Sequence, residues 1–132
     1  TGVQTCALPI CTWVQGGTEY RIQNKQSAEL LLTCSPHDNV FVRYTAPDGK
    51  TLTSGNDDGR SLEAQTDNSD TFLINDTLSD AGGSNFEAFW NAVRKSQRIH
   101  ITATGLTSTT FTFSNAARTL PEFDKSGCLT RM

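Results

Sequence analysis

The sequence predicts an α+β domain in which about six or seven short antiparallel strands, as one sheet or a sandwich, pack against one amphipathic helix. A short C-terminal helix is expected to follow. Three observations predict this fold class: residues 85–96 carry apolar side chains at helical spacing, several short segments alternate apolar and polar residues, and turn-forming residues separate them. A chain of 132 residues suffices for one domain with a buried core.

Residues 1–10 look like a translated sequencing adapter. Their sequence, TGVQTCALPI, matches the in-frame translation of a common short-read adapter at every position. We therefore expect residues 1–10 to be non-native, and residues 11–132 to form a single small globular domain that is an N-terminally truncated metagenomic fragment. The codon of Cys11 would then be chimeric, and the natural residue at that position would be lost.

The first half of the chain predicts a meander of three or four antiparallel strands. Tyr20 and Ile22 alternate with polar residues in an expected strand over residues 19–23. Residues 29–34 include three consecutive leucines and fit either a strand buried on both faces or a short helical turn, and their short length favours the strand. The last part of the meander is expected at residues 40–45, with Val40, Val42 and Tyr44 on one face against Phe41 and Arg43, then the turn Pro47-Asp48-Gly49 and Leu52.

Two more strands are expected before the helix, at residues 61–65 and 71–75. Phe72 and Ile74 share one face of the second of these segments. Polar, turn-forming loops separate them from each other and from the helix.

Residues 85–96 predict the helix that anchors the core. Ser84 and Glu87 have the spacing of a capping box, in which each side chain accepts a hydrogen bond from the backbone N–H of the other. Arg94 and Lys95 stand in the last turn, where cations suit the helix dipole. Burying each large apolar side chain contributes roughly 1.5–3 kcal/mol, and one face carries Phe86, Phe89, Trp90 and Val93.

A hairpin and a short helix follow. Residues 98–104 and 109–114 alternate apolar and polar side chains around a turn at residues 105–108, which predicts a β-hairpin. Ser114 is expected to cap a short helix that ends at Pro121 and places Ala116, Ala117 and Leu120 on one side.

This tail resembles that of several small exported bacterial proteins. The shared features are a helix, a strand, the pattern Phe-x-Phe-Ser-x-x-Ala-x-x-Leu from Phe111 to Leu120, and the late Cys128. The chain is similar here to type VI secretion-associated periplasmic proteins and to invasion-associated locus B-like proteins, over about a third of its length. Asn115 replaces the glycine that often follows the Phe-x-Phe pair. The resemblance implies export and an accessory or binding role, and it lends no catalytic residues.

Cys34 and Cys128 are the cysteines outside the suspect segment, which holds Cys6 and adjoins Cys11. They show no metal-ligand spacing and form no C-x-x-C motif. The leading interpretation is a disulfide that ties the tail to the sheet, which would stabilise the fold by roughly 4 kcal/mol in the chain-entropy treatment. The alternative is a pair of buried thiols that act as small hydrophobic side chains.

Charge and hydropathy exclude several classes of function. The net charge of −3 and the lack of a basic run disfavour binding to nucleic acid or to an anionic membrane. No apolar stretch approaches the length of a membrane span.

No catalytic, cofactor or metal site is expected. The two histidines, His37 and His100, read as structural or surface residues, and no nucleophile elbow, phosphate loop or zinc motif is present. Oxygen-rich loops suit calcium, but they lack the EF-hand spacing and are better explained as solvated turns. These loops hold Asp57 with Asp58, Asp67 with Asp70, and Asp76 with Asp80.

The sequence therefore favours a non-catalytic accessory or binding module of the bacterial cell envelope, periplasmic or secreted, whose partner is a protein or another envelope component. Phe41, Arg43 and Tyr44 are the candidate partner surface, because aromatic residues and arginine are enriched at interface hot spots. One alternative is a small hydrolase or hydrolase inhibitor that acts at the acidic loops. Another is a phage or secretion-apparatus structural protein, which would self-associate.

Overall fold

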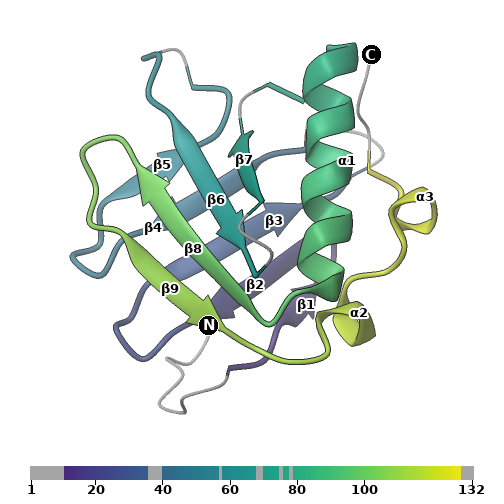
Figure 1. Cartoon of the computed structure of the whole chain (residues 1–132), viewed down its shortest axis with the longest axis horizontal. Coiled ribbons are helices and arrows are strands. Elements are labelled where there is room, and N and C mark those ends of the chain that lie inside the picture. Colours follow the sequence, from purple (N-terminus) through teal and green to yellow (C-terminus); the bar gives the residue numbers. More distant parts are fainter. Residues whose placement is uncertain are drawn as a thin grey trace.

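The computed structural model consists of two antiparallel sheets, one long helix and two short helices (Figure 1). It describes residues 11–35, 40–56, 58–67, 70–74, 76–77 and 79–128. These residues contain nine strands rather than the six or seven expected, and the α+β fold class is confirmed.

The first sheet is a five-stranded meander in which each strand pairs with the next along the chain. Leu30 and Leu32 enter the core while Leu31 is buried on the opposite face, so the strand interpretation of residues 29–34 is confirmed. β1 was not expected from the sequence, because its three residues are exposed and include a glycine. The strands are β1 (Val14–Gly16), β2 (Glu19–Gln23), β3 (Glu29–Thr33), β4 (Val42–Thr45) and β5 (Thr51–Thr53).

The second sheet has four strands in the order β7-β6-β8-β9. The expected β8–β9 hairpin is confirmed, since Ile99 pairs with Phe111 and both side chains are buried. The helix α1 (Asp80–Lys95) leads from β7 to β8, which pairs with the opposite side of β6. The strands are β6 (Leu62–Thr66), β7 (Thr71–Ile74), β8 (Arg98–Ala103) and β9 (Thr109–Thr112).

α1 begins earlier than the sequence predicted, and the expected cap at Ser84 is wrong. The Ser79 hydroxyl accepts from the N–H of Gly82 at 3.0 Å, and the Asp76 carboxylate accepts from the N–H of Ser79 at 2.8 Å. Ser84 lies exposed inside the helix. A Cβ at Gly82 would collide with the backbone carbonyl of Asp76, so the glycine permits this close approach.

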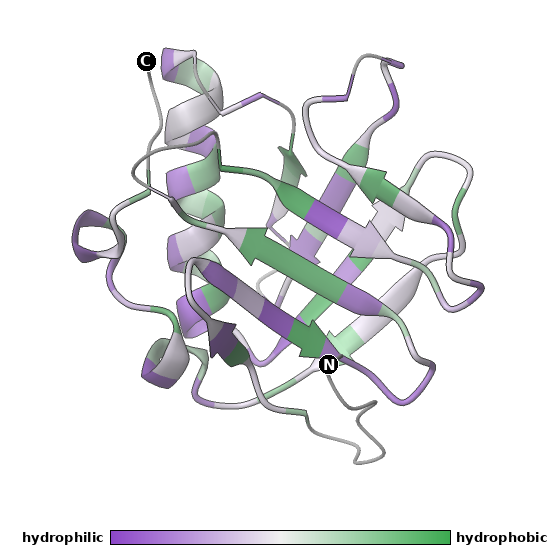
Figure 2. Ribbon diagram, turned by 180° about the vertical axis from the view of Figure 1, so that it is seen from behind, coloured by the Kyte–Doolittle hydropathy of each residue, from purple (hydrophilic) through white to green (hydrophobic). Residues whose placement is uncertain are grey.

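The two sheets face each other, and α1 closes one side of the space between them (Figure 1). The rings of Tyr44 and Phe111 meet edge to face across the sheets, with centroids 6.3 Å apart. Trp90 contacts Tyr20 of the first sheet, and Phe89 contacts Phe72 of the second. The expected apolar face of α1 is thus confirmed as an anchor of the core. Figure 2 shows the resulting alternation of hydrophilic and hydrophobic residues along the strands.

The tail wraps around α1 through two short helices, α2 (Ala116–Thr119) and α3 (Phe123–Ser126). Asn115, not Ser114, precedes α2 and adopts the left-handed conformation with φ 54°, which asparagine tolerates better than most residues. Ala117 is exposed, so the expectation that it shares the buried side of α2 is also wrong. The indole of Trp90 donates to the carbonyl of Pro121 at 2.8 Å.

A disulfide joins Cys34, just after β3, to Cys128, just after α3. The pair spans a sequence separation of 94 residues, and the two Cα atoms lie 4.4 Å apart. This is the pairing that the leading interpretation of the sequence expected. It fixes the tail to the first sheet while Phe123 packs against the rings of Phe86 and Trp90.

Candidate functional site

The expected partner surface loses one of its three members in the structure, because Tyr44 is fully buried. Its hydroxyl donates to the carbonyl of Thr107 at 2.6 Å and lies 2.8 Å from the hydroxyl oxygen of Thr109. Burial raises the pKa of Tyr44, the hydrogen bond with Thr109 lowers it, and the charge of Asp48 raises it further. Tyr44 therefore links the two sheets and is not available to a partner.

Phe41 and Arg43 do lie together on the outer face of the first sheet. The Arg43 guanidinium carbon stands 5.3 Å from the centroid of the Phe41 ring, and its Nε donates to the hydroxyl of Thr53 at 3.3 Å. This stacking holds the planar guanidinium in one place. Over the ranges that the structure describes, no carboxylate lies within ion-pair distance of Arg43.

The register places Arg43 in a row that crosses all five strands. Arg21 and Arg43 are the cross-strand neighbours of Leu31, which is only 2% exposed although it lies outside the core. Long arginine stems cover apolar surface in this way. We call this row, together with Phe41, the outer-face row; its members are Val14, Arg21, Leu31, Arg43 and Thr53.

The two arginines of the outer-face row differ in their charge environment. Arg21 donates to the Glu19 carboxylate at 2.5 Å and lies 3.6 Å from a carboxylate oxygen of Glu29. The hydrogen bond with Glu19 raises the pKa of Arg21. Arg21 is thus neutralised within the molecule, whereas Arg43 keeps a charge that a partner could contact.

A second candidate is a groove of about 490 Å³ between α1 and the edge strand β7, which we call the β7 groove. The sequence does not predict this groove, because it does not show the pairing order that makes β7 an edge strand. One signal was present: small residues at Ala88 and Ala92 repeat at helical spacing beside the large apolar face. The groove is lined by Asp70, Thr71, Phe72, Ala88, Asn91, Ala92 and Lys95.

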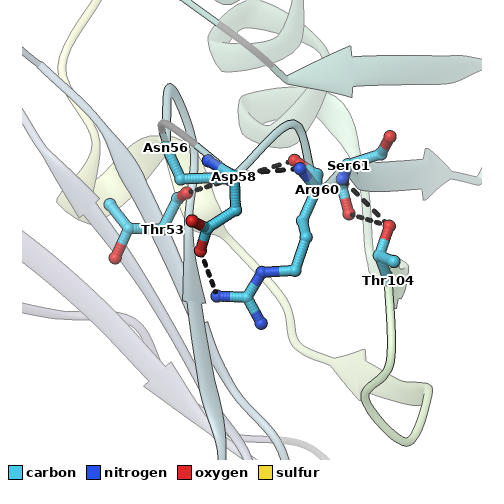
Figure 3. A network of polar contacts seen from close by, with 6 residues as sticks. All are labelled: Thr53, Asn56, Asp58, Arg60, Ser61 and Thr104. Carbon is cyan, nitrogen blue, oxygen red and sulfur yellow. Dashed lines mark hydrogen bonds and ion pairs between the residues drawn. The ribbon is translucent and has the colours of Figure 1, made fainter.

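Several side chains of the acidic loops shape the local backbone. Figure 3 shows the loop after β5, where Asn56 accepts from the N–H groups of Asp58 and Arg60 and its amide donates to the carbonyls of Thr53 and Arg60. Asp58 pairs with Arg60 at 3.4 Å. These contacts shape a turn.

The neighbouring acidic residues also support the backbone. Asp67 accepts from the N–H of Gln97 at 2.7 Å, and Asp76 accepts from Ser79 at the start of α1. Asp57 lies outside the described residues. In the described part of the chain, no three His, Cys, Asp or Glu side chains gather as a metal ion would need.

The histidines form no described catalytic pair. His37 lies outside the described residues. His100 is half-buried on the outer face of the second sheet, where its Nδ1 lies 2.9 Å from the Thr110 hydroxyl.

Among the residues that the structure describes, none of the helices has the length and apolar character needed to cross a membrane.

A family model described as YfjT matches residues 11–120, which is most of the chain. No curated protein and no solved structure matches the chain.

Proposed function

We propose that this chain, which belongs to the YfjT family, is a non-catalytic binding module. It works in the periplasm or outside the bacterial cell. Its partner is a protein or another component of the cell envelope. The observation that carries this proposal is the disulfide between Cys34 and Cys128.

Disulfides form and persist in oxidising compartments, and they are rare in the reducing cytoplasm. The Cys34–Cys128 bond closes a long loop and links the end of the tail to the first sheet, as a structural disulfide does. Cys34 is 3% exposed, which shields its sulfur from attack by thiols in solution. An exported location provides the oxidising environment in which this disulfide forms and persists.

The outer-face row supplies the contact surface. Arg43 is exposed, its guanidinium lies over the Phe41 ring, and it forms no ion pair with a carboxylate among the described residues. A guanidinium held in this way loses little conformational freedom when it binds, and it can form two parallel hydrogen bonds with a carboxylate or phosphate group. We therefore expect Arg43 to make the strongest single contact with the partner.

The test is retention of envelope extract on the immobilised protein, compared between wild type and Arg43→Ala. The expected result is a retained component whose binding falls at least about tenfold in Arg43→Ala, the scale of a hot-spot arginine. Arg98→Ala is the matched control, because Arg98 is also an exposed strand arginine but lies on the second sheet. Equal retention by wild type and Arg43→Ala at low and high salt would refute the proposed surface.

A further inference from the structure

We propose that the β7 groove binds an extended peptide segment, which adds to the free edge of β7 at Thr71. This inference goes beyond the proposed function, because it concerns a different surface from the outer-face row. The groove volume, about 490 Å³, lies within the range of known ligand sites. Addition of a strand to an exposed sheet edge is a common mode of peptide recognition.

The free edge follows from the hydrogen-bond pattern of β7. Consecutive residues of a paired strand direct their backbone groups to opposite sides. The carbonyl of Asp70 accepts from the N–H of Thr66, so it faces β6. The carbonyl of Leu73 accepts from the Asn85 side chain at 2.9 Å, so it faces α1. Thr71 follows Asp70 directly and stands two residues before Leu73, so it has the same orientation as Leu73. Both its N–H and its C=O therefore point away from β6.

Helix α1 already satisfies one part of this edge and leaves the next part open. The Asn85 amide takes the place of a neighbouring strand at the carbonyl of Leu73. At Thr71, no described residue forms a hydrogen bond with the outward backbone N–H or C=O. An added peptide backbone would supply one acceptor and one donor there, and the half-buried amide of Asn91 lines the same groove.

The floor and wall of the groove favour an apolar side chain in the peptide. Phe72 is half-buried and packs edge to face on Phe89, with centroids 5.8 Å apart. Ala88 and Ala92 line the same groove from α1, and their side chains are single methyl groups that fill little of it. One side chain of the peptide would cover this apolar surface.

Charge determines what the peptide carries beside that residue. Lys95 and Asp70 both line the groove, and the ion pairs among the described residues include neither of them. Lys95 therefore favours a carboxylate in the peptide, while Asp70 opposes a second one. The occupant is an extended segment with one apolar residue and one acidic residue, rather than an acidic run.

The probe is a displayed library of random heptapeptides, selected on the immobilised protein. We expect enriched clones that carry an apolar residue near a single Glu or Asp. Synthetic peptides from these clones should bind Thr71→Pro about tenfold more weakly, the scale of losing a backbone hydrogen bond and its partner. Proline removes the outward N–H and is tolerated at strand edges. Thr71→Val keeps that N–H and should bind as wild type does.

A second pair of variants tests the pocket without touching the strand. Ala88→Trp fills the groove and should abolish binding, whereas Ala81→Trp, exposed on the same helix outside the groove, should not. If Thr71→Pro fails to fold, a scan of single N-methyl groups along the peptide replaces it, and at least one position must weaken binding. Absence of enriched clones, or clones that bind Ala88→Trp as well as wild type, would overturn the proposal.

Discussion

Short polar residues and one glycine determine where α1 begins. The capping-box spacing with Glu87 predicts Ser84 as the cap. In the structure, Ser79 is the cap, because Asp76 holds it in position and Gly82 lets the Asp76 carbonyl lie against the first turn. The glycine that lowered the helical propensity of this segment is the residue that permits the contact.

Gly82→Ala should therefore destabilise the protein, although alanine normally stabilises a helix relative to glycine. The new methyl group would collide with the carbonyl of Asp76, at a cost of roughly 1–3 kcal/mol in the free energy of unfolding. Urea unfolding measures this. Ser84→Ala is the control and should leave stability unchanged or slightly higher; a loss of about 1 kcal/mol there would instead identify Ser84 as the cap.

Tyr44 shows why a residue type does not reveal a role. An aromatic residue on a strand fits a partner surface and a core equally well, and only the pairing of the sheets shows that its hydroxyl reaches Thr107 and Thr109. The sequence did place Tyr44 on the face opposite to Arg43, and the structure confirms that alternation.

Tyr44→Phe should lower the free energy of unfolding by roughly 0.5–1.5 kcal/mol, because the hydrogen bond from the Tyr44 hydroxyl to the carbonyl of Thr107 is lost. It should also change the dependence of stability on pH. Burial raises the pKa of Tyr44 in the folded state above the usual value near 10. The folded state thus holds this proton more tightly, and wild-type stability falls as the pH rises above about 10. Unfolding of the variant, measured from pH 8 to 11, should show a weaker decline; identical slopes would contradict this role.

Elements with local signals were predictable, and those fixed by distant pairing were not. The β8–β9 hairpin and the apolar face of α1 depend on residues close in the sequence, whose alternation and helical spacing the sequence displays. β1 has neither signal and exists because Val14 and its neighbours pair with β2. The β7 groove could not be predicted, because β8 follows β7 in the chain but pairs with β6.

The tail depends on its disulfide more than on its two short helices. α2 and α3 have four residues each, too few to be stable alone. Hydrogen bonds from Trp90 and Arg94 to the carbonyls of Pro121 and Leu120 hold the chain against α1, and the bond between Cys34 and Cys128 fastens its end.

Removal of this bond should lower the free energy of unfolding by roughly 4–5 kcal/mol in the chain-entropy treatment of a loop of this length. Cys34→Ser, Cys128→Ser and the double variant should be destabilised by similar amounts, because each lacks the same bond. Denaturant unfolding compares them. Nearly additive losses in the double variant would show that the two sulfurs act separately.

At the scale of the molecule, two sheets enclose the core, α1 closes one side, and the Cys34–Cys128 disulfide joins the tail to the first sheet. The two surfaces proposed for contact are the outer-face row and the β7 groove. A fold stabilised by this disulfide keeps its structure in an oxidising compartment outside the cytoplasm. This property is central to the proposed function.

The most direct test of the account is the redox state of the cysteines in protein recovered from the cells that produce it. The sample is quenched in acid, alkylated before and after reduction, and analysed by mass spectrometry. The account predicts that Cys34 and Cys128 react with the alkylating reagent only after reduction. Alkylation of both residues in the unreduced sample would contradict both the disulfide in the cell and the exported location that it supports.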